Sequence, residues 1–223
     1  MTGSDTAQAH WHPSPNHGPR RNGLRPELVV LHYTQMPDAA SALKRLCSPE
    51  AEVSAHYLIG ADGSLWQMVP EAMRAWHAGA GSWRRQDDIN SRSIGIELDN
   101  DGASPFAAPQ MRALERLLPG ILARWSIPPH GVIAHSDMAP ERKSDPGPKF
   151  DWRRLARLGL SVWPDPENHA ETPLETALTR IGYPPAPPEV RLKAFRLRFR
   201  PGHTGPEDAT DRTLAASLAE MLQ

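Results

Sequence analysis

Three side chains with the chemistry of metal ligands stand at the ends of short apolar runs or in the loop that follows one of them. His135 ends a β-branched run, and a loop punctuated by proline and glycine leads from it to Asp145, ten positions later. His32 ends another apolar run. Two histidines and one carboxylate are ordinary zinc ligands, and three protein ligands leave a fourth position open, as in catalytic zinc sites. The pattern predicts an open metal site, with His56 and His77 as alternative ligands on composition alone.

Two further charged residues lie near these candidates in the sequence. Glu97 interrupts the apolar run 93–98, and burying a carboxylate there is costly unless it has a partner or a function. It is either a solvent-facing strand position or a general acid or base that faces water at the metal. Lys143 lies between His135 and Asp145, where it is either a surface charge or a group that stabilises an oxyanion.

The elements that must position these residues alternate between strands and helices. Apolar runs predict strands at 28–33, 93–98 and 132–135, and a hairpin at 54–59 and 65–69 that turns at Asp62 and Gly63. Helical patterns cover 38–46, 109–125 and 150–158. Residues 70–92, with Trp76 and Trp83, are expected to form a long loop over the site. This order predicts an α/β (α+β) fold with a mixed central sheet flanked by helices.

A polar, proline-rich stretch predicts a domain boundary after this region. The expected organisation is a catalytic domain at 1–163, a linker at 164–173 and a small three-helix domain at 174–223. Its helices are expected at 174–181, 189–199 and 209–222. The second of them is basic, which could indicate nucleic-acid or membrane binding. The interleaved Leu192, Phe195 and Phe199 instead favour an apolar core with the basic residues on a solvated face. These basic residues are Arg191, Lys193, Arg196, Arg198 and Arg200.

Composition narrows the class of protein. The 223 residues include 25 Lys and Arg against 26 Asp and Glu, a net charge of −1 that argues against nucleic-acid and membrane partners. A single cysteine, Cys47, excludes an internal disulfide. Residues 1–27 contain no apolar export signal, which predicts a cytoplasmic protein, or a periplasmic one if a signal has been removed. The chain is expected to be a monomer.

Several motifs together resemble one enzyme family. HSDMAPERKSDPGPKFDW resembles the C-terminal signature of the zinc-dependent N-acetylmuramoyl-L-alanine amidases of the AmpD/AmiD type. SPN, LVVLHYT, VSAHYLI, DGSLWQMVPEAMRAWHAG and NSRSIGIELDN are similar to the family's other blocks, in the same order. The resemblance implies a peptidoglycan-recognition and phage lysozyme-amidase fold with one zinc ion. It also implies hydrolysis of the amide between (anhydro-)N-acetylmuramic acid and L-alanine, in cell-wall recycling.

The resemblance implies a role for each matching residue. The metal ligands are His32, His135 and Asp145, and the catalytic residues are Glu97 and Lys143. The residues expected to bind substrate are Tyr33, Trp76, His77, Asn90 and Arg92. Tyr33 departs from some relatives, which carry a different polar residue after the first ligand, so this wall of the groove is expected to differ.

The C-terminal segment has a second, shorter resemblance. EVRLKAFRLRFRPG and DATDRTLAASLAEML are similar to the small three-helix peptidoglycan-binding domain, which AmiD-type enzymes carry and compact AmpD-type enzymes often lack. The expected partner is therefore peptidoglycan or soluble anhydromuropeptides. Three alternatives stay open: an exported amidase that acts on intact peptidoglycan, a non-catalytic peptidoglycan recognition protein, and a zinc peptidase that cuts within the stem peptide.

Overall fold

A mixed six-stranded sheet forms the centre of the computed structural model, which describes residues 4–165 and 172–223. The strand order is β1-β5-β4-β7-β3-β8. The strands are β1 (His10–Trp11), β3 (Leu28–Tyr33), β4 (Tyr57–Ile59), β5 (Leu65–Gln67), β7 (Ser93–Leu98) and β8 (Val132–Ala134). β4 and β5 pair antiparallel and the other neighbours pair parallel. The predicted mixed sheet is confirmed, and most of the predicted linker lies outside the described residues.

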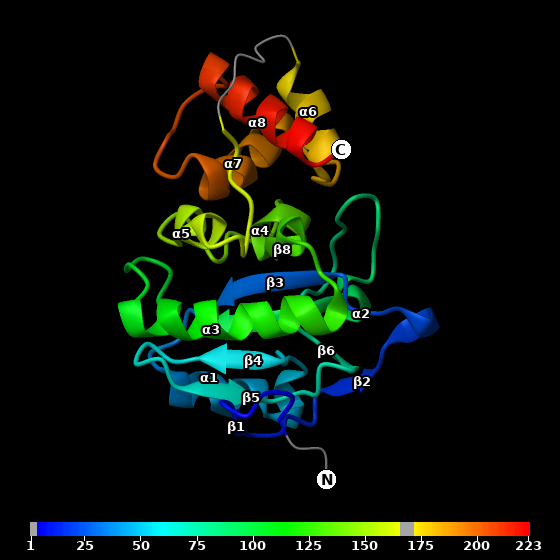
Figure 1. Cartoon of the computed structure of the whole chain (residues 1–223), viewed down its shortest axis with the longest axis vertical. Coiled ribbons are helices and arrows are strands. Elements are labelled where there is room, and N and C mark those ends of the chain that lie inside the picture. The colour runs from blue at the N-terminus through cyan, green and yellow to red at the C-terminus, as the bar shows by residue number, and fades with distance from the viewer. Residues whose placement is uncertain (1–3, 166–171) are drawn as a thin grey trace.

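Helices cover both faces of this sheet. The helices before the C-terminal segment are α1 (Ala39–Leu46), α2 (Ile89–Arg92), α3 (Ala108–Trp125), α4 (His135–Met138) and α5 (Trp152–Arg157), with single 3-10 turns at Arg21–Gly23, Pro49–Ala51 and Pro129–Gly131. Figure 1 shows α3 running across one face of the sheet. Ile94, Ile96 and Leu98 of β7 pack with Leu114 and Leu118 of α3 in one apolar core.

Strand alternation decides which side chains face away from α3. Because successive side chains of a strand point to opposite faces, Glu97 projects on the face opposite Ile96 and Leu98. On β3, Leu31 belongs to the core beneath α3, so His32 projects to the other side. His32 and Glu97 therefore share one face of the sheet.

The segment predicted as a single long loop is partly regular, so that prediction is wrong at both ends. Residues 70–92 contain β6 (Met73–Ala75), which pairs antiparallel with β2 (His17–Pro19), and end in α2. The predicted strand 132–135 also ends one residue early. β8 stops at Ala134 because the Asp137 side chain accepts a hydrogen bond from the Ala134 N–H at 2.9 Å, which lets His135 begin α4.

Three helices follow the sheet region, as predicted. They are α6 (Leu174–Ile181), α7 (Pro188–Phe199) and α8 (Ala209–Met221), and Figure 1 shows them grouped beyond α4 and α5. Their apolar side chains share one core with residues of β3, β8 and α4. Members of this shared core include Val30, Ile133, Met138, Leu178, Phe195 and Leu218. The three helices thus cover apolar surface of the sheet region.

The arginines of α7 do not form the solvated face that the sequence predicts. Arg191, Arg196 and Arg198 are only 5%, 6% and 3% exposed. Each is buried because a carboxylate neutralises it: the partners are Glu175, Asp211 and Asp137, respectively. Lys193 is exposed, as expected.

Arg198 joins α7 to α4, α5 and β8 through several contacts. Its guanidinium donates to Asp137 Oδ2 at 2.6 Å and to the Val132 carbonyl at 3.0 Å, and lies over the Trp152 ring at 4.2 Å. Tyr183 donates its hydroxyl to the other oxygen of Asp137 at 2.8 Å. The helix that begins with His135 is therefore bound to the C-terminal helices by a buried carboxylate.

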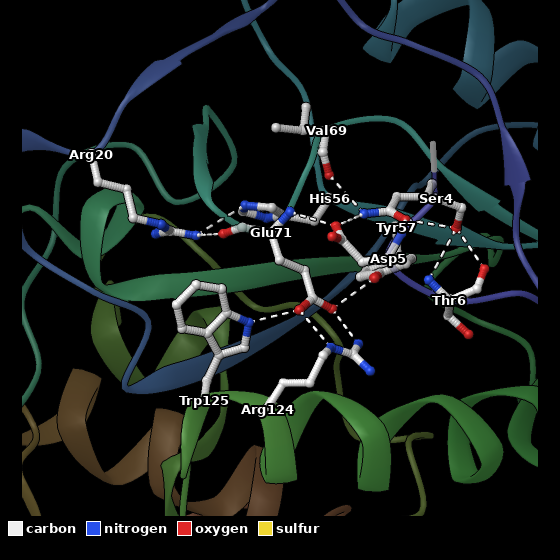
Figure 2. A network of polar contacts seen from close by, with 11 residues as sticks. Ser4, Asp5, Thr6, Arg20, His56, Tyr57, Val69, Glu71, Arg124 and Trp125 are labelled. Carbon is white, nitrogen blue, oxygen red and sulfur yellow. Dashed lines mark hydrogen bonds and ion pairs between the residues drawn. The ribbon is translucent and has the colours of Figure 1, made fainter. Parts of the chain in front are cut away.

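A second buried carboxylate joins α3 to the sheet (Figure 2). Glu71, 2% exposed, accepts hydrogen bonds from the Tyr57 hydroxyl at 2.7 Å, from Trp125 Nε1 at 2.6 Å and from the Arg124 guanidinium. Its backbone N–H donates to Asp5 at 2.8 Å. Burial raises the pKa of Glu71, but the bonds from Arg124, Tyr57 and Trp125 outweigh burial and leave the pKa below its ordinary value.

Candidate functional site

The three predicted metal ligands meet in one cluster. His32 lies near the end of β3, His135 begins α4, and Asp145 lies in the loop beyond it. His32 Nδ1 and His135 Nδ1 are 2.9 Å apart, and each is 2.9 Å from Asp145 Oδ2. Among residues 4–165 and 172–223, this is the one cluster of three histidine, cysteine or acidic side chains with metal-site geometry.

The chemistry of these three atoms fits a small divalent cation. His135 Nε2 lies 2.9 Å from the Ala78 carbonyl, which can only accept, and 3.4 Å from Arg142 Nη2, which can only donate. The shorter contact to the carbonyl favours the ring proton on Nε2, so that Nδ1 presents a lone pair. Burial and the neighbouring His135 lower the pKa of His32 to about 4, so its imidazole is neutral near pH 7. Lone pairs that converge this closely repel unless a cation lies among them. Zinc bonds to nitrogen and oxygen ligands are about 2.0–2.2 Å long, so one ion can touch all three atoms.

The two alternative histidines have other partners. His56 is fully buried, with Nδ1 accepting the Gly95 N–H at 2.9 Å and Nε2 donating to the Met73 carbonyl at 3.1 Å. Both of its nitrogens are therefore engaged with the backbone. His77 lies behind His32, with its Nδ1 3.0 Å from His32 Nε2. Neither belongs to the metal cluster.

A cavity of about 330 Å³ opens over the cluster. Except for Asn90 and Arg92, all the residues predicted for the site line it: His32, Tyr33, Trp76, His77, Glu97, His135, Lys143 and Asp145. The geometry thus brings the three candidate metal ligands, a carboxylate and an amine to one concave surface.

Glu97 is half-buried at this cavity rather than directed into bulk solvent. Its Oε2 is buried and has no hydrogen-bond partner within the described part of the chain. Burial raises the pKa of Glu97 well above its ordinary value, and the charge of Asp145 raises it further. A carboxylate with a raised pKa and a free oxygen can take up and release a proton.

Of the remaining residues predicted for the site, some line the cavity and others lie outside it. Tyr33 Oη lies 3.0 Å from Ser144 Oγ at the cavity wall, and Lys143 is exposed at its edge. Asn90 lies outside the cavity, and its Oδ1 accepts the backbone N–H groups of the segment that contains His77. Arg92 also lies outside and pairs with Glu27 at 2.9 Å.

Sequence reasoning missed two cationic residues of the cavity, Arg142 and Arg45. The Arg142 guanidinium donates to the carbonyls of Ala78 and Ala80, which ties the loop between the metal ligands to the segment after Trp76. The signal was its position beside Lys143, between His135 and Asp145. Arg45 belongs to α1 and is separated from every motif, so the sequence offered no signal for it.

The family model for N-acetylmuramoyl-L-alanine amidases matches residues 22–148, a span that contains both candidate histidine ligands, Asp145 and Glu97. The chain belongs to this amidase family. The amidase is 39% identical to N-acetylmuramoyl-L-alanine amidase AmiD of Escherichia coli, over 88% of this chain and 83% of AmiD. It is 34% identical to 1,6-anhydro-N-acetylmuramyl-L-alanine amidase AmpD of Enterobacter cloacae, over 64% of this chain and 86% of AmpD.

Solved structures agree with this assignment. E. coli AmiD, in complex with its substrate anhydro-N-acetylmuramic acid-L-Ala-D-γ-Glu-L-Lys, superimposes with a TM-score of 0.79 at 36% identity, over 90% of this chain and 91% of AmiD. AmpDh3 of Pseudomonas aeruginosa, in complex with anhydromuramic pentapeptide, gives a TM-score of 0.79 at 31% identity, over 99% of both chains. The amidase therefore shares its mixed α/β architecture, a central mixed sheet flanked by helices, with relatives of known structure.

The amidase contains no helix, in the part of the chain that the structure describes, with the length and apolar character needed to cross a membrane.

Proposed function

We propose that this amidase cleaves the amide bond between 1,6-anhydro-N-acetylmuramic acid and the L-alanine of soluble peptidoglycan fragments, with one zinc ion held by His32, His135 and Asp145. The proposal rests on one observation: the three candidate ligands, Glu97 and Lys143 all line the same cavity. The anhydromuramyl peptides bound in the AmiD and AmpDh3 structures support the substrate class.

Each residue has a separate task in this reaction. Zinc held by His32, His135 and Asp145 would supply a Lewis acid that polarises the amide carbonyl and lowers the pKa of water. Glu97 takes a proton from the attacking water through its unpartnered Oε2 and gives a proton to the leaving amine of L-alanine. Lys143, at the cavity edge, donates to the oxygen that becomes negative as the carbonyl carbon becomes tetrahedral.

The cavity walls bind the rest of the substrate. Tyr33 and Trp76 present aromatic surface, which suits the apolar faces of a sugar ring. Arg45 and Arg142 present positive charge, which suits the carboxylates of a stem peptide. The mixture of aromatic and cationic groups matches a ligand that is part sugar and part acidic peptide.

Mass spectrometry of the reaction products tests the proposal. The zinc-loaded enzyme is incubated with soluble anhydromuropeptide and, separately, with intact sacculi. Free stem peptide with L-alanine at its new amino terminus is the expected product from the soluble substrate. A product in which the sugar keeps L-alanine would show a peptidase instead, and no product at all would contradict catalysis.

Comparing product release from the soluble fragment and from sacculi identifies the physiological substrate. Release from the soluble fragment alone supports recycling in the cytoplasm, whereas rapid release from sacculi would assign the enzyme to the intact wall. Binding of the three C-terminal helices to peptidoglycan stays a prediction, which co-sedimentation of the Glu97→Gln variant with sacculi tests. Size-exclusion chromatography with light scattering tests the predicted monomer.

A further inference from the structure

A chain of hydrogen bonds leads away from His32 on the side opposite the metal cluster. His32 Nε2 lies 3.0 Å from His77 Nδ1, and His77 Nε2 lies 3.1 Å from Ser93 Oγ. The Ser93 hydroxyl in turn donates to the carbonyl of Ile89 at 2.6 Å. The chain thus ends on a backbone oxygen, which can accept a hydrogen bond but never donate one.

This terminal acceptor fixes the direction of every bond in the chain. Since Ser93 gives its one proton to Ile89, its oxygen must accept from His77 Nε2. A neutral imidazole carries one N–H, so His77 Nδ1 has no proton and accepts a hydrogen bond from the N–H at His32 Nε2. His32 Nδ1 is then left with the lone pair that points at His135 and Asp145.

The second histidine ligand is fixed from the same short segment. His135 Nε2 donates to the carbonyl of Ala78, the residue that follows His77. Asn90 Oδ1 accepts the backbone N–H groups of both His77, at 3.0 Å, and Ala78, at 2.8 Å. One side-chain oxygen of α2 therefore holds the two groups that orient the two histidine ligands.

Packing also reserves the place of His77. A Cβ atom at Gly95 of β7 would lie 2.4 Å from Cγ of the His77 ring. Glycine at this position leaves the space that the ring occupies, between His32 and Ser93. The ring is held by its neighbours as well as by its hydrogen bonds.

We propose that His77, Ser93 and Asn90 are positioning residues of the metal centre, which hold His32 and His135 in the tautomer that presents Nδ1 to the ion. This inference rests on the proposed zinc site, and it gives His77 a task beyond the cavity wall. Groups behind the ligands typically change metal affinity 10–100-fold when they are removed.

The test measures zinc affinity by competition with a chromophoric chelator, without any substrate. Ser93→Ala removes the acceptor of the His77 proton, and His77→Phe removes the acceptor of the His32 proton. Ser91→Ala is the matched control, because Ser91 is an equally buried serine of the same turn whose hydroxyl accepts the Arg21 N–H and lies outside this chain. The expected zinc affinity falls about tenfold in Ser93→Ala, at least tenfold in His77→Phe, and less than twofold in Ser91→Ala.

Long-range ¹H–¹⁵N NMR spectra of the unmodified zinc-loaded enzyme give a second measurement. They are expected to show the proton of His77 on Nε2, and a mixture of tautomers in Ser93→Ala. A His77 proton on Nδ1, or equal zinc affinity in Ser93→Ala and Ser91→Ala, would overturn the inference. Failure of the unmodified enzyme to bind zinc would instead contradict the proposed function, so the two failures are distinguishable.

Discussion

Glu97 of β7 is the register partner of His32 of β3, on the face of the sheet that lies away from α3. The two strands run parallel and are hydrogen-bonded neighbours. Backbone pairing of two central strands therefore fixes the distance between a carboxylate and a proposed metal ligand, without the help of a loop. Functional groups on such elements are positioned more accurately than groups on loops.

The first prediction separates proton transfer from metal binding. Glu97→Gln keeps the size of the side chain but cannot take up a proton, so we expect kcat to fall about 10²–10⁴-fold. Zinc content measured by mass spectrometry or atomic absorption should stay at that of the unmodified enzyme. Near-normal turnover in this variant would show that another group is the base.

The second prediction concerns the ligand set. His135→Ala removes one of three protein ligands, so we expect zinc and amidase activity to be lost together. His56→Ala is the comparison, since the His56 nitrogens contact backbone groups and Arg20, and its ring packs edge-on against His77 rather than against a candidate ligand. That variant should lose stability but retain zinc in its folded fraction. Full zinc occupancy in His135→Ala would disprove the ligand assignment.

The third prediction concerns the amine at the cavity edge. Lys143→Met keeps the aliphatic stem and removes the charge, so we expect kcat to fall about a hundredfold, with zinc content unchanged. Lys149→Met is the control, because Lys149 is exposed and does not line the cavity. Equal kcat values for these two variants would show that Lys143 is a surface charge with no part in the reaction.

The fourth prediction is a pH dependence of folding. Because the pKa of folded Glu71 lies below its ordinary value of 4.5, its ionised form favours the folded state. The contribution of the Glu71 carboxylate to the free energy of unfolding is complete above the pKa that Glu71 has in the unfolded chain. It is lost as the pH falls through the pKa of Glu71 in the folded protein. We expect the urea midpoint of the unmodified protein to fall more steeply below pH 5 than that of Glu71→Gln. Parallel pH profiles would mean that Glu71 is not stabilised as the carboxylate.

The fifth prediction concerns the buried pair between α4 and α7. Arg198→Met leaves Asp137 buried with Tyr183 as its remaining side-chain donor, which should lower the free energy of unfolding by about 3–5 kcal/mol. Lys193→Met, at an exposed position of the same helix, should change it by less than about 0.5 kcal/mol. Urea titration followed by circular dichroism measures both. Similar midpoints for the two variants would show that the pair contributes little.

Local pattern was enough to predict the elements that carry the site. The apolar runs at β3 and β7 were predicted with their observed bounds, because both strands are central and almost wholly buried. His32, His135 and Asp145 were found from strand ends and a loop of fixed length, and the family resemblance then gave them roles. The structure brings these three residues together.

What the sequence could not supply were partners distant in the chain. β6 has no apolar period of its own and exists because β2 pairs with it from more than fifty positions away. Arg198 was expected in solvent because its carboxylate partner lies 61 positions earlier. The alternation of β7 identified a polar face but could not distinguish water from a cavity on that face. The first two expectations were wrong and the third question stayed open for the same reason, because contacts with residues distant in the chain override a local pattern.

The shared core beneath α6, α7 and α8 also bears on how the enzyme is made. A ribosome delivers Val30, Ile133 and Asp137 well before Leu178, Phe195 and Arg198, the residues that cover or neutralise them. A growing chain that already contains all three proposed metal ligands still exposes apolar surface, and its Asp137 still lacks Arg198 as an ion-pair partner. Such surface is what chaperones and proteases recognise. We therefore expect chaperones and proteases to recognise a prematurely terminated chain, in which α6, α7 and α8 do not yet pack against α4, the helix that begins with His135.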